Sequence, residues 1–496
     1  MRILRNVLLI LLVCVLYEIL GILVSSAWHR PVSNSTKNSF RPEECYSDQT
    51  GTERVLCIDD NMEALLWRLR VIETAEKELV LSTFEMRDDN SGKDMMSALY
   101  HAAERGVHIR IFLDGLNGKL RLSKSEHFQT LASHLNVEVK FYAPVNPLKP
   151  WNITFCMHDK YLIADSRVYI LGGRNVYDYF LGNYPGRVNI DRDLLVYETD
   201  SARTDSSLIQ LRGYFESIWE LSCCKRVKGS GKHPYGRNQA KAVRQSETGE
   251  RANAKGQPKI RESRENAERY LRKHYMELQK RYPSAFEETD YLSATVAVNK
   301  ITLLSNPQKP FCREPKIWYE LAQLMRCRNH VTIQTPYIIC NRRMYQDLSE
   351  IAGSTGSLEI ITNAVESGAN PWGCTDYLNQ KSNILAAGAS VCEFLGAASN
   401  HIKTILIDDR LSVVGSYNLD ERSTYLDTEL MLAVDSEELC EQLRRSVERD
   451  LEFCKQVFSD GTEYFGDSYV PVEMAPDKEK FYRILRTIIR PFRYLL

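Results

Sequence analysis

The stretch "NHIKTILIDDRLSVVGSYNLDERS", residues 400–423, places a histidine and a lysine two positions apart at the start of a strand-like apolar run. An earlier stretch, "MHDKYLIADSRVYILGGRN" at 157–175, has nearly the same pattern. The shared motif reads His-x-Lys, four residues, Asp, six residues, Gly-(Gly/Ser)-x-Asn. Two copies with identical spacing indicate an internal repeat, so the chain is predicted to fold as two related halves.

Both motifs supply candidate site residues of the same chemical types. The first copy contains His158, Lys160, Asp165 and Asn175, with Gly173 where the second copy has a serine; the second copy contains His401, Lys403, Asp408, Ser416 and Asn418. Residues i and i+2 of a strand point the same way, so each His and Lys share a face. The "DSR" and "DDR" turns then fold each motif into a hairpin, which returns the Asn beside the His. The two motif Asp residues are predicted to lie at these turns and to serve structure.

The side chains that converge are suited to phosphoryl transfer. Two lysines and two asparagine amides would hold a phosphoryl group and stabilise its developing charge. A neutral imidazole can attack phosphorus, and a protonated one can donate to the leaving oxygen. The sequence shows no cluster of metal-ligand type, so the lysines would take the role that Mg²⁺ has in other enzymes. We therefore expect no metal and no cofactor.

Each histidine also needs an acid that orients its ring through the other nitrogen. The candidates lie on the strand after each motif, in "DLLVYETD" from Asp193 and "ELMLAVDS" from Glu429. Aligning the two stretches predicts Asp193 and Glu429 as the orienting acids. Asp191 is the alternative in the first half.

The surrounding sequence alternates strands with helices. "ELVLSTFEM" (78–86) and "HVTIQTPYI" (330–338) are typical of buried strands, and each is followed by a helical stretch and a further strand. This alternation predicts an α/β fold with two similar halves, 52–224 and 291–460, each a β-sheet flanked by helices with the active site between them. Of the 496 residues, 43% are hydrophobic and 26% charged, which is typical of a globular protein. Thirteen cysteines without a CxxC pair signal neither a zinc site nor a disulfide framework.

The remaining segments differ in composition. Residues 1–30 contain an apolar run from Val7 to Trp28, predicted as a single membrane anchor, with a cleaved signal peptide as the alternative. Residues 31–51 form a tether. The linker 225–290 has 17 Lys/Arg against 6 Glu over 225–281, and its second part is predicted to be a helix that packs on the domain or binds anionic lipid headgroups. The tail 461–496 carries a basic amphipathic helix, predicted to be interfacial, with docking on protein as the alternative.

Two copies of the HxKx4Dx6G(G/S)xN motif resemble the phospholipase D superfamily, over residues 52–460. The flanks "GGRNVYDYF" and "GSYNLDERSTYLDTEL" are most similar to bacterial cardiolipin synthases. The resemblance implies paired α/β halves, a phosphohistidine intermediate formed without metal, His158 as nucleophile and His401 as acid. It also implies a membrane enzyme that moves a phosphatidyl group from one phosphatidylglycerol to another and releases glycerol.

Two other functions remain open on the sequence. A phosphodiesterase that uses water, acting on phospholipid or nucleic acid, has the same catalytic residues. The basic linker would suit a nucleic-acid backbone, but the anchor and the basic tail favour lipid. A catalytically inactive membrane scaffold is disfavoured because both motifs are intact. The sequence does not define the oligomeric state.

Overall fold

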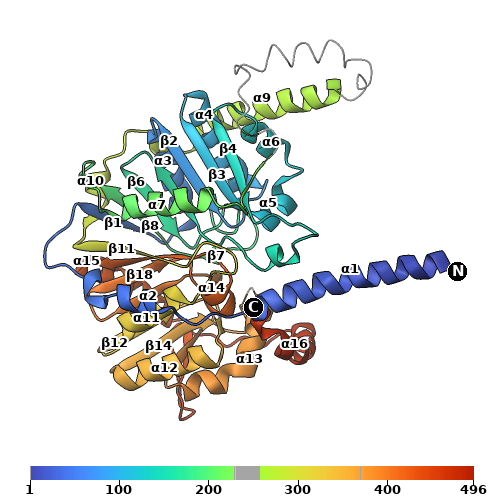
Figure 1. The fold of residues 1–496 in the computed structure, drawn as a ribbon. Coiled ribbons are helices and arrows are strands. Elements are labelled where there is room, and N and C mark those ends of the chain that lie inside the picture. The colour runs from blue at the N-terminus through green and yellow to red at the C-terminus, as the bar shows by residue number, and fades with distance from the viewer. Residues whose placement is uncertain (1, 228–229, 231–256, 369) are drawn as a thin grey trace.

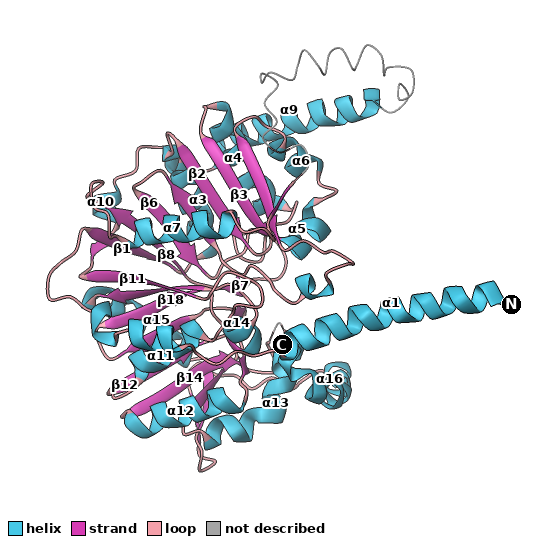
Figure 2. Cartoon of the chain, in the orientation of Figure 1, coloured by secondary structure: helices cyan, strands magenta, loops and turns pink. Residues whose placement is uncertain are grey.

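The computed structural model describes residues 2–227, 230, 257–368 and 370–496, and it has the predicted α/β fold with two halves, one above the other in Figure 1. Most of the first part of the basic linker, for which the polar, Gly-containing composition predicts mobility, lies outside these residues. Each half is built on one mixed sheet, and Figure 2 shows the strands of the two sheets stacked with helices around them.

The strands of the first sheet come mainly from residues before the linker. Within the described residues its order is β10 (Val296–Ala297), β1 (Glu53–Ile58), β8 (Asp193–Glu198), β6 (Val168–Gly172), β5 (Tyr161–Ala164), β2 (Glu78–Thr83), β3 (His108–Asp114), β4 (Val137–Tyr142) and β9 (Lys225–Arg226). The β2, β3 and β4 strands are parallel, and the hairpin β5–β6 runs antiparallel beside β2.

The second sheet repeats this order. It runs β11 (Lys300–Ser305), β20 (Leu430–Asp435), β18 (Leu411–Gly415), β17 (Thr404–Ile407), β12 (His330–Gln334), β14 (Ser357–Asn363), β15 (Ser390–Phe394), β21 (Cys454–Val457) and β22 (Glu463–Phe465). Following the order across each sheet, the strands from β11 to β15 correspond one by one to those from β1 to β4. Corresponding neighbours also pair in the same direction. The internal repeat in the sequence is therefore a repeat of topology.

Helices cover the outer face of each sheet. In the first half these are α3 (Asn61–Thr74), α4 (Asn90–Glu104), α5 (Gly115–Leu122), α6 (Glu126–Ala132) and α9 (Gln257–Arg281); in the second they are α11 (Lys316–Met325), α12 (Arg342–Ser354) and α13 (Pro371–Ala386). The remaining short elements are α2 (Asn34–Ser39), η1 (Pro42–Cys45), η2 (Pro150–Ile153), η3 (Pro283–Ala285), α10 (Tyr291–Ala294), α14 (Glu421–Tyr425), and the strands β7 (Asn189–Ile190), β13 (Ile338–Ile339), β16 (Ser399–Asn400) and β19 (Leu419–Asp420).

The two halves share a third apolar core between the sheets. It includes helices α7 (Ser207–Trp219) and α15 (Glu437–Leu451) and strand residues of both halves, such as Val55 and Leu432. In α15 the buried side chains of Leu439, Leu443 and Val447 are spaced by four residues, as one helix face requires, and the Ser436 side chain caps its first turn. This shared core fixes the halves against each other.

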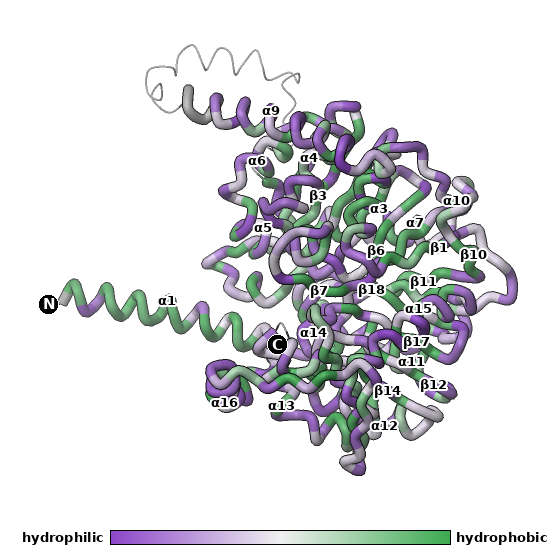
Figure 3. Tube along the Cα trace, turned by 180° about the vertical axis from the view of Figure 1, so that it is seen from behind, coloured by the Kyte–Doolittle hydropathy of each residue, from purple (hydrophilic) through white to green (hydrophobic). Residues whose placement is uncertain are grey.

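An apolar helix projects from the junction of the two halves. Helix α1 (Arg2–Ala27) contains a stretch, Ile3–Ala27, that is long and apolar enough to cross a membrane (Figure 3). Its last turns contact the loop before the first motif: the Tyr17 hydroxyl donates to the carbonyl of Leu148 at 3.0 Å, and the Ser25 and Thr154 hydroxyls lie 2.8 Å apart.

The C-terminal helix α16 (Pro476–Ile489) has two apolar faces. One buries Tyr482, Leu485 and Ile489, and the helix packs on α13. The other, called here the exposed stripe of α16, consists of Phe481, Ile484 and Ile488. The helix is therefore docked on protein and also presents apolar side chains to its surroundings. The following η4 (Arg490–Leu495) is held by an ion pair between Arg493 and the buried Asp376.

Helix α9 of the linker packs on the domain, one of its two predicted roles. It buries Leu271, Tyr275 and Leu278 and lies against α4 and α6. The Arg272 guanidinium binds Glu104 at 2.7 Å and reinforces this contact.

Candidate active site

Each motif forms the hairpin that its sequence predicts. In β5–β6 Tyr161 pairs with Leu171, and continuing this register places position 174 opposite His158. In β17–β18 Thr404 pairs with Val414, which places position 417 opposite His401 in the same way. Each asparagine therefore returns beside its histidine.

The motif aspartates lie at the hairpin turns, where both have positive φ, 51° for Asp165 and 50° for Asp408. Asp165 Oδ1 accepts the backbone N–H of Lys77 at 2.9 Å and of Glu78 at 2.8 Å. Asp408 Oδ1 accepts the N–H of His330 at 3.0 Å in the corresponding place. These carboxylates tie each hairpin to the neighbouring strand, which is a structural role.

Backbone hydrogen bonds between the halves bring the two histidines to one interface. The N–H of His401 donates to the carbonyl of Ile190 at 2.8 Å, where β16 pairs with β7. On the other side the N–H of His158 donates to the carbonyl of Thr428 at 3.3 Å, where Met157 pairs with Thr428. The strand segment before each histidine is thus paired with the segment before the acid of the opposite half.

The ring-orienting acids cross between the halves. His158 Nδ1 lies 2.8 Å from Glu429 Oε1, and His401 Nδ1 lies 2.6 Å from Asp191 Oδ2. Glu429 also accepts hydrogen bonds from the hydroxyls of Ser416 and Ser423. Holding Nδ1 in this way fixes each ring and leaves Nε2 for chemistry.

The prediction of Asp193 as an orienting acid is wrong, and the alternative, Asp191, occupies that place. The Asp193 carboxylate is buried within its own half, where it binds Arg68 at 2.8 Å and Arg174 at 3.2 Å. Gly172 pairs with Asp193 whereas Gly415 pairs with Met431, so Asp191 is the counterpart of Glu429. The predicted alignment was two residues out of register, an error that leaves the alternation of strand faces unchanged.

Both lysines are buried beside the histidines. Lys160 Nζ donates to the carbonyl of His158 at 2.6 Å, and Lys403 Nζ lies 2.6 Å from His401 Nδ1. Burial lowers the pKa of Lys160 to about 7, although Glu429 opposes the shift, and lowers that of Lys403 to about 8 against Asp191. A bound phosphodiester anion would favour the charged form of both lysines.

The two asparagines differ in their partners. Asn175 Oδ1 accepts the N–H of Glu85 at 3.3 Å, and its side chain also interacts with the Tyr177 hydroxyl. The Asn418 side chain lies 3.1 Å from the Tyr337 hydroxyl, and its other amide atom is buried without a partner among the described residues. With the amide turned by half a rotation, the hydroxyl donates to Oδ1 and the NH₂ group is free to bind a phosphoryl oxygen.

Gly173 and Ser416 also make the halves unequal. A Cβ at Gly173 would lie 2.2 Å from Asp191 Oδ1, so a serine does not fit there. In the second half Ser416 fits and donates to the longer Glu429 side chain.

Electrostatics distinguish the two histidine–acid pairs. Burial, with Lys403 adding to it, lowers the pKa of His401 to about 4, and burial and Lys160 lower that of His158 well below its ordinary value. Burial alone would raise the pKa of Asp191, but Lys403 and His401 outweigh it and bring it to about 2. Burial raises the pKa of Glu429 to about 8. The empty site thus has neutral imidazoles, and a bound phosphodiester anion would favour their protonation.

Several neighbours of the site carry no sequence motif and were not predicted. The Phe84 ring meets the edge of the His158 ring at 4.8 Å between centroids, and Phe180 meets His401 at 5.0 Å. Phe84 directly follows strand β2, which is the one signal that could have found it. Arg422 binds Asp427 at 2.9 Å and the carbonyl of Thr154 at 3.0 Å, linking the segments that precede the site residues of both halves.

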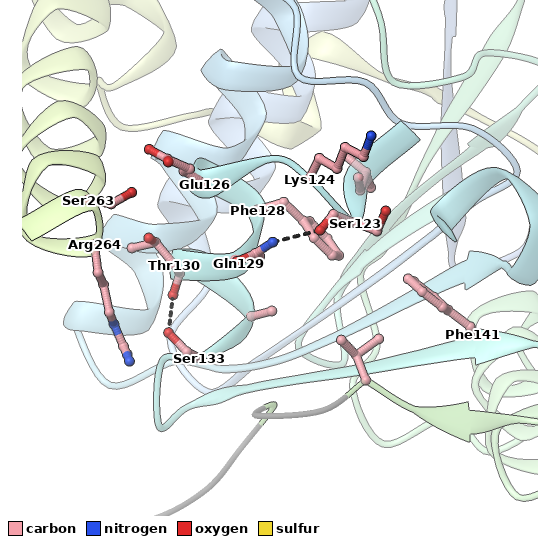
Figure 4. Close-up of a pocket in the computed structure, with 13 residues that line it drawn as sticks. Ser123, Lys124, Glu126, Phe128, Gln129, Thr130, Ser133, Phe141, Ser263 and Arg264 are labelled. Atoms are coloured by element: carbon pink, nitrogen blue, oxygen red, sulfur yellow. Dashed lines mark hydrogen bonds between the residues drawn. The ribbon is translucent and has the colours of Figure 1, made fainter. Parts of the chain in front are cut away.

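A pocket of about 680 Å³ lies away from this site, between α6, β4 and α9 (Figure 4). Its lining includes Phe128, Phe141 and Arg264. The chain that continues from Val227 at its edge lies outside the described residues, and no function is assigned to it.

The duplicated sheet, the paired hairpins and the crossed histidine–acid pairs define a phospholipase D-like protein. The family described as "Cardiolipin synthase, PLD-like domain" matches residues 69–219 and 321–451, together more than half of the chain. The chain belongs to this family, and it is an enzyme of the phospholipase D superfamily. The predicted superfamily and fold class are thereby confirmed.

Individual relatives are distant. An uncharacterized protein of Helicobacter pylori strain 26695 is 26% identical over 421 residues, covering 79% of this chain and 78% of the relative. Cardiolipin synthase C of Escherichia coli K12 is 26% identical over 419 residues, covering 77% and 82%. The crystal structure of phosphatidylserine synthase from Haemophilus influenzae Rd KW20 superposes with a TM-score of 0.57 at 13% identity, covering 92% of this chain and 97% of that one, and supports the fold.

Proposed function

We propose that this enzyme is a membrane-anchored cardiolipin synthase that converts two phosphatidylglycerol molecules into cardiolipin and glycerol. The observation that carries the proposal is the pair of histidines held at one interface by acids of the opposite half, at 2.8 and 2.6 Å, with two buried lysines beside them. The family match and the similarity to cardiolipin synthase C support the lipid reaction.

In the first step His158 Nε2 attacks the phosphorus of the donor lipid. The P–O bond to the headgroup glycerol breaks, and the proton on His401 Nε2 passes to the glycerol oxygen. We assign these roles from the family resemblance. The assignment is supported by Asp191, whose pKa of about 2 keeps it ionised, since an ionised acid stabilises the imidazolium that His401 must become.

In the second step a hydroxyl of the acceptor phosphatidylglycerol loses its proton to His401 and attacks phosphorus. The P–N bond to His158 breaks, and cardiolipin leaves. Lys160, Lys403 and the two asparagine amides bind the non-bridging oxygens throughout. One phosphodiester is exchanged for another, so the reaction needs no nucleotide.

The position of α1 supports a site at the membrane surface. The loop that α1 contacts, around Leu148 and Thr154, leads directly to His158. Helix α16, which carries the exposed stripe, lies on the side of the molecule from which α1 projects (Figure 1). Lipid acceptors would thus be abundant where the intermediate forms, which favours transfer over hydrolysis.

A hydrolase of the same superfamily is the second candidate, because water could replace the lipid hydroxyl in the second step. The test is to give purified enzyme phosphatidylglycerol, phosphatidylethanolamine or an oligonucleotide and to identify the products by mass. Cardiolipin and glycerol from phosphatidylglycerol support the synthase. Phosphatidic acid without cardiolipin, or cleavage of the oligonucleotide alone, refutes it.

A further inference from the structure

Two arginines share one carboxylate at the first-half side of the site. Glu85 Oε1 binds Arg87 Nε at 2.8 Å and Arg121 Nε at 2.8 Å. The two guanidinium groups thus share one carboxylate, and Asp89 is a further acid that acts on Arg87. Glu85 is nearly buried, while the side chain of Arg87 is 27% exposed and that of Arg121 is 50% exposed. Solvent, and hence a ligand, can reach both cations.

This cluster, Glu85 with Arg87 and Arg121, is directly attached to the catalytic residues. Phe84, the residue before Glu85, contacts the His158 ring at 4.8 Å. The N–H of Glu85 donates to the side chain of Asn175 at 3.3 Å. Glu85, which binds both arginines, therefore has two direct links to the active site. One is its neighbour Phe84, and the other is its backbone bond to Asn175.

The Arg87 side chain is held in a fixed position. Its guanidinium lies 3.7 Å from the centroid of the Tyr177 ring and 5.3 Å from that of Tyr179. Its backbone N–H donates to the carbonyl of Val176 at 3.1 Å. A stacked guanidinium keeps its remaining N–H groups available for an anion.

The second half lacks this feature at the matching positions. Met86 pairs with Val176, and Ile338 pairs with Leu419 in the same relation to the motif asparagine. By this register Arg87 corresponds to Ile339, and Tyr177 to Asp420. The fold itself therefore does not require an arginine at position 87.

We propose that Arg87 and Arg121 bind the phosphodiester of the acceptor lipid. The proposal rests on the proposed function. An acceptor phosphatidylglycerol carries its own phosphodiester one glycerol unit from the attacking hydroxyl, whereas water and free glycerol carry none. Arginine forks match phosphate oxygens in geometry and charge. Helix α5, which carries Arg121, lies on the side from which α1 projects (Figures 1 and 3), so the acceptor can arrive from the membrane.

The experiment compares two acceptors that differ in this phosphate. Full-length enzyme receives phosphatidylglycerol vesicles together with deuterated free glycerol, and cardiolipin and deuterated phosphatidylglycerol are counted in the same reaction. In Arg121→Gln we expect cardiolipin formation to fall about 10- to 100-fold, the range for a charge-assisted hydrogen bond. Formation of deuterated phosphatidylglycerol is expected to stay within about twofold of wild type, because surface substitutions have small effects.

Two further variants complete the design. Arg87→Lys keeps the charge but loses the fork, and we expect the same selective loss to a smaller extent. Arg445→Gln, at a side chain on α15 that is 70% exposed and pairs with Glu441, is the matched control and should change neither product.

Equal loss of both products in the Arg121 and Arg87 variants would mean a structural role and would overturn the subsite. Unchanged cardiolipin formation would overturn it as well. A wild-type enzyme that makes only phosphatidic acid would overturn the proposed function and the subsite with it. This outcome is distinguished from failure of the subsite alone because it is seen in the wild-type enzyme, without any variant.

Discussion

Replacing Asp191 by asparagine removes the charge that holds His401 while keeping the shape of the side chain. The carboxylate lies 2.6 Å from His401 Nδ1 and 3.9 Å from Lys403 Nζ. An amide can turn its oxygen to Nδ1, but without a negative charge it stabilises an imidazolium less than the carboxylate does. We therefore expect the step in which His401 carries a proton to become slow.

The size of the effect follows from the pKa of Asp191. The site lowers it from 3.8 to about 2, so its surroundings favour the ionised form by about 2.5 kcal/mol at about 1.4 kcal/mol per unit. Loss of that amount in the transition state corresponds to about 70-fold in kcat. Loss of the correct tautomer adds to this, and the comparable change in serine proteases reduces kcat about 10⁴-fold. We expect a decrease between these limits.

Asp193→Asn is the matched control, two residues along the same chain. It removes charge from the buried ion pairs with Arg68 and Arg174 and is expected to destabilise the protein by about 3–5 kcal/mol. Its kcat per folded molecule should change little. The assay is initial cardiolipin formation on vesicles, normalised to folded protein measured by circular dichroism.

Asp191→Asn should also change how the folding stability responds to acid. In wild type the stabilisation from Asp191 is fully present above about pH 4 and is lost as the pH falls towards 2, because its folded pKa is depressed. Asp191→Asn should remove this acid sensitivity.

The reasoning is refuted if Asp191→Asn retains normal kcat, or if Asp193→Asn loses kcat as severely while it remains folded.

Four other outcomes are expected. His158→Ala and His401→Ala should each reduce turnover by several orders of magnitude without unfolding, and near-normal activity of either would contradict a shared site. The kcat/KM should rise with pH as Glu429 ionises near 8 and fall as Lys160 loses its proton near 7, giving a narrow optimum between about 7 and 8; a profile that is flat from pH 5 to 9 would contradict these assignments. EDTA should leave activity intact, whereas loss restored by a divalent ion would refute the metal-free mechanism. Replacing the exposed stripe of α16 by serine should slow cardiolipin formation on vesicles more than in detergent, and equal rates in both would argue against membrane contact.

The fold was predictable because the repeat and the strand periodicity are local signals. The spacing of His158, Lys160 and Asn175 determines which residues of a hairpin lie together, and the structure has that register. Shared topology then followed from finding the same spacing twice.

The partners of the histidines were harder to predict because they depend on contacts between the halves. Nothing in the chain near His158 shows that its acid, Glu429, comes from the other half. Asp191 and Asp193 are two residues apart, so strand alternation alone does not separate them, and only the ladder register does. Phe84 and Arg87 carry no motif, and their place beside the site results from tertiary packing.

The central claim, one covalent site made by two histidines, is tested by trapping the intermediate. A phosphatidyl ester of p-nitrophenol has a leaving group that needs no proton, so His401→Ala should still form the adduct but release it slowly. Rapid quenching and peptide mass analysis should then find a phosphatidyl group on the peptide that contains His158, and none in His158→Ala. An adduct on neither histidine, or an unchanged adduct in His158→Ala, would contradict the account.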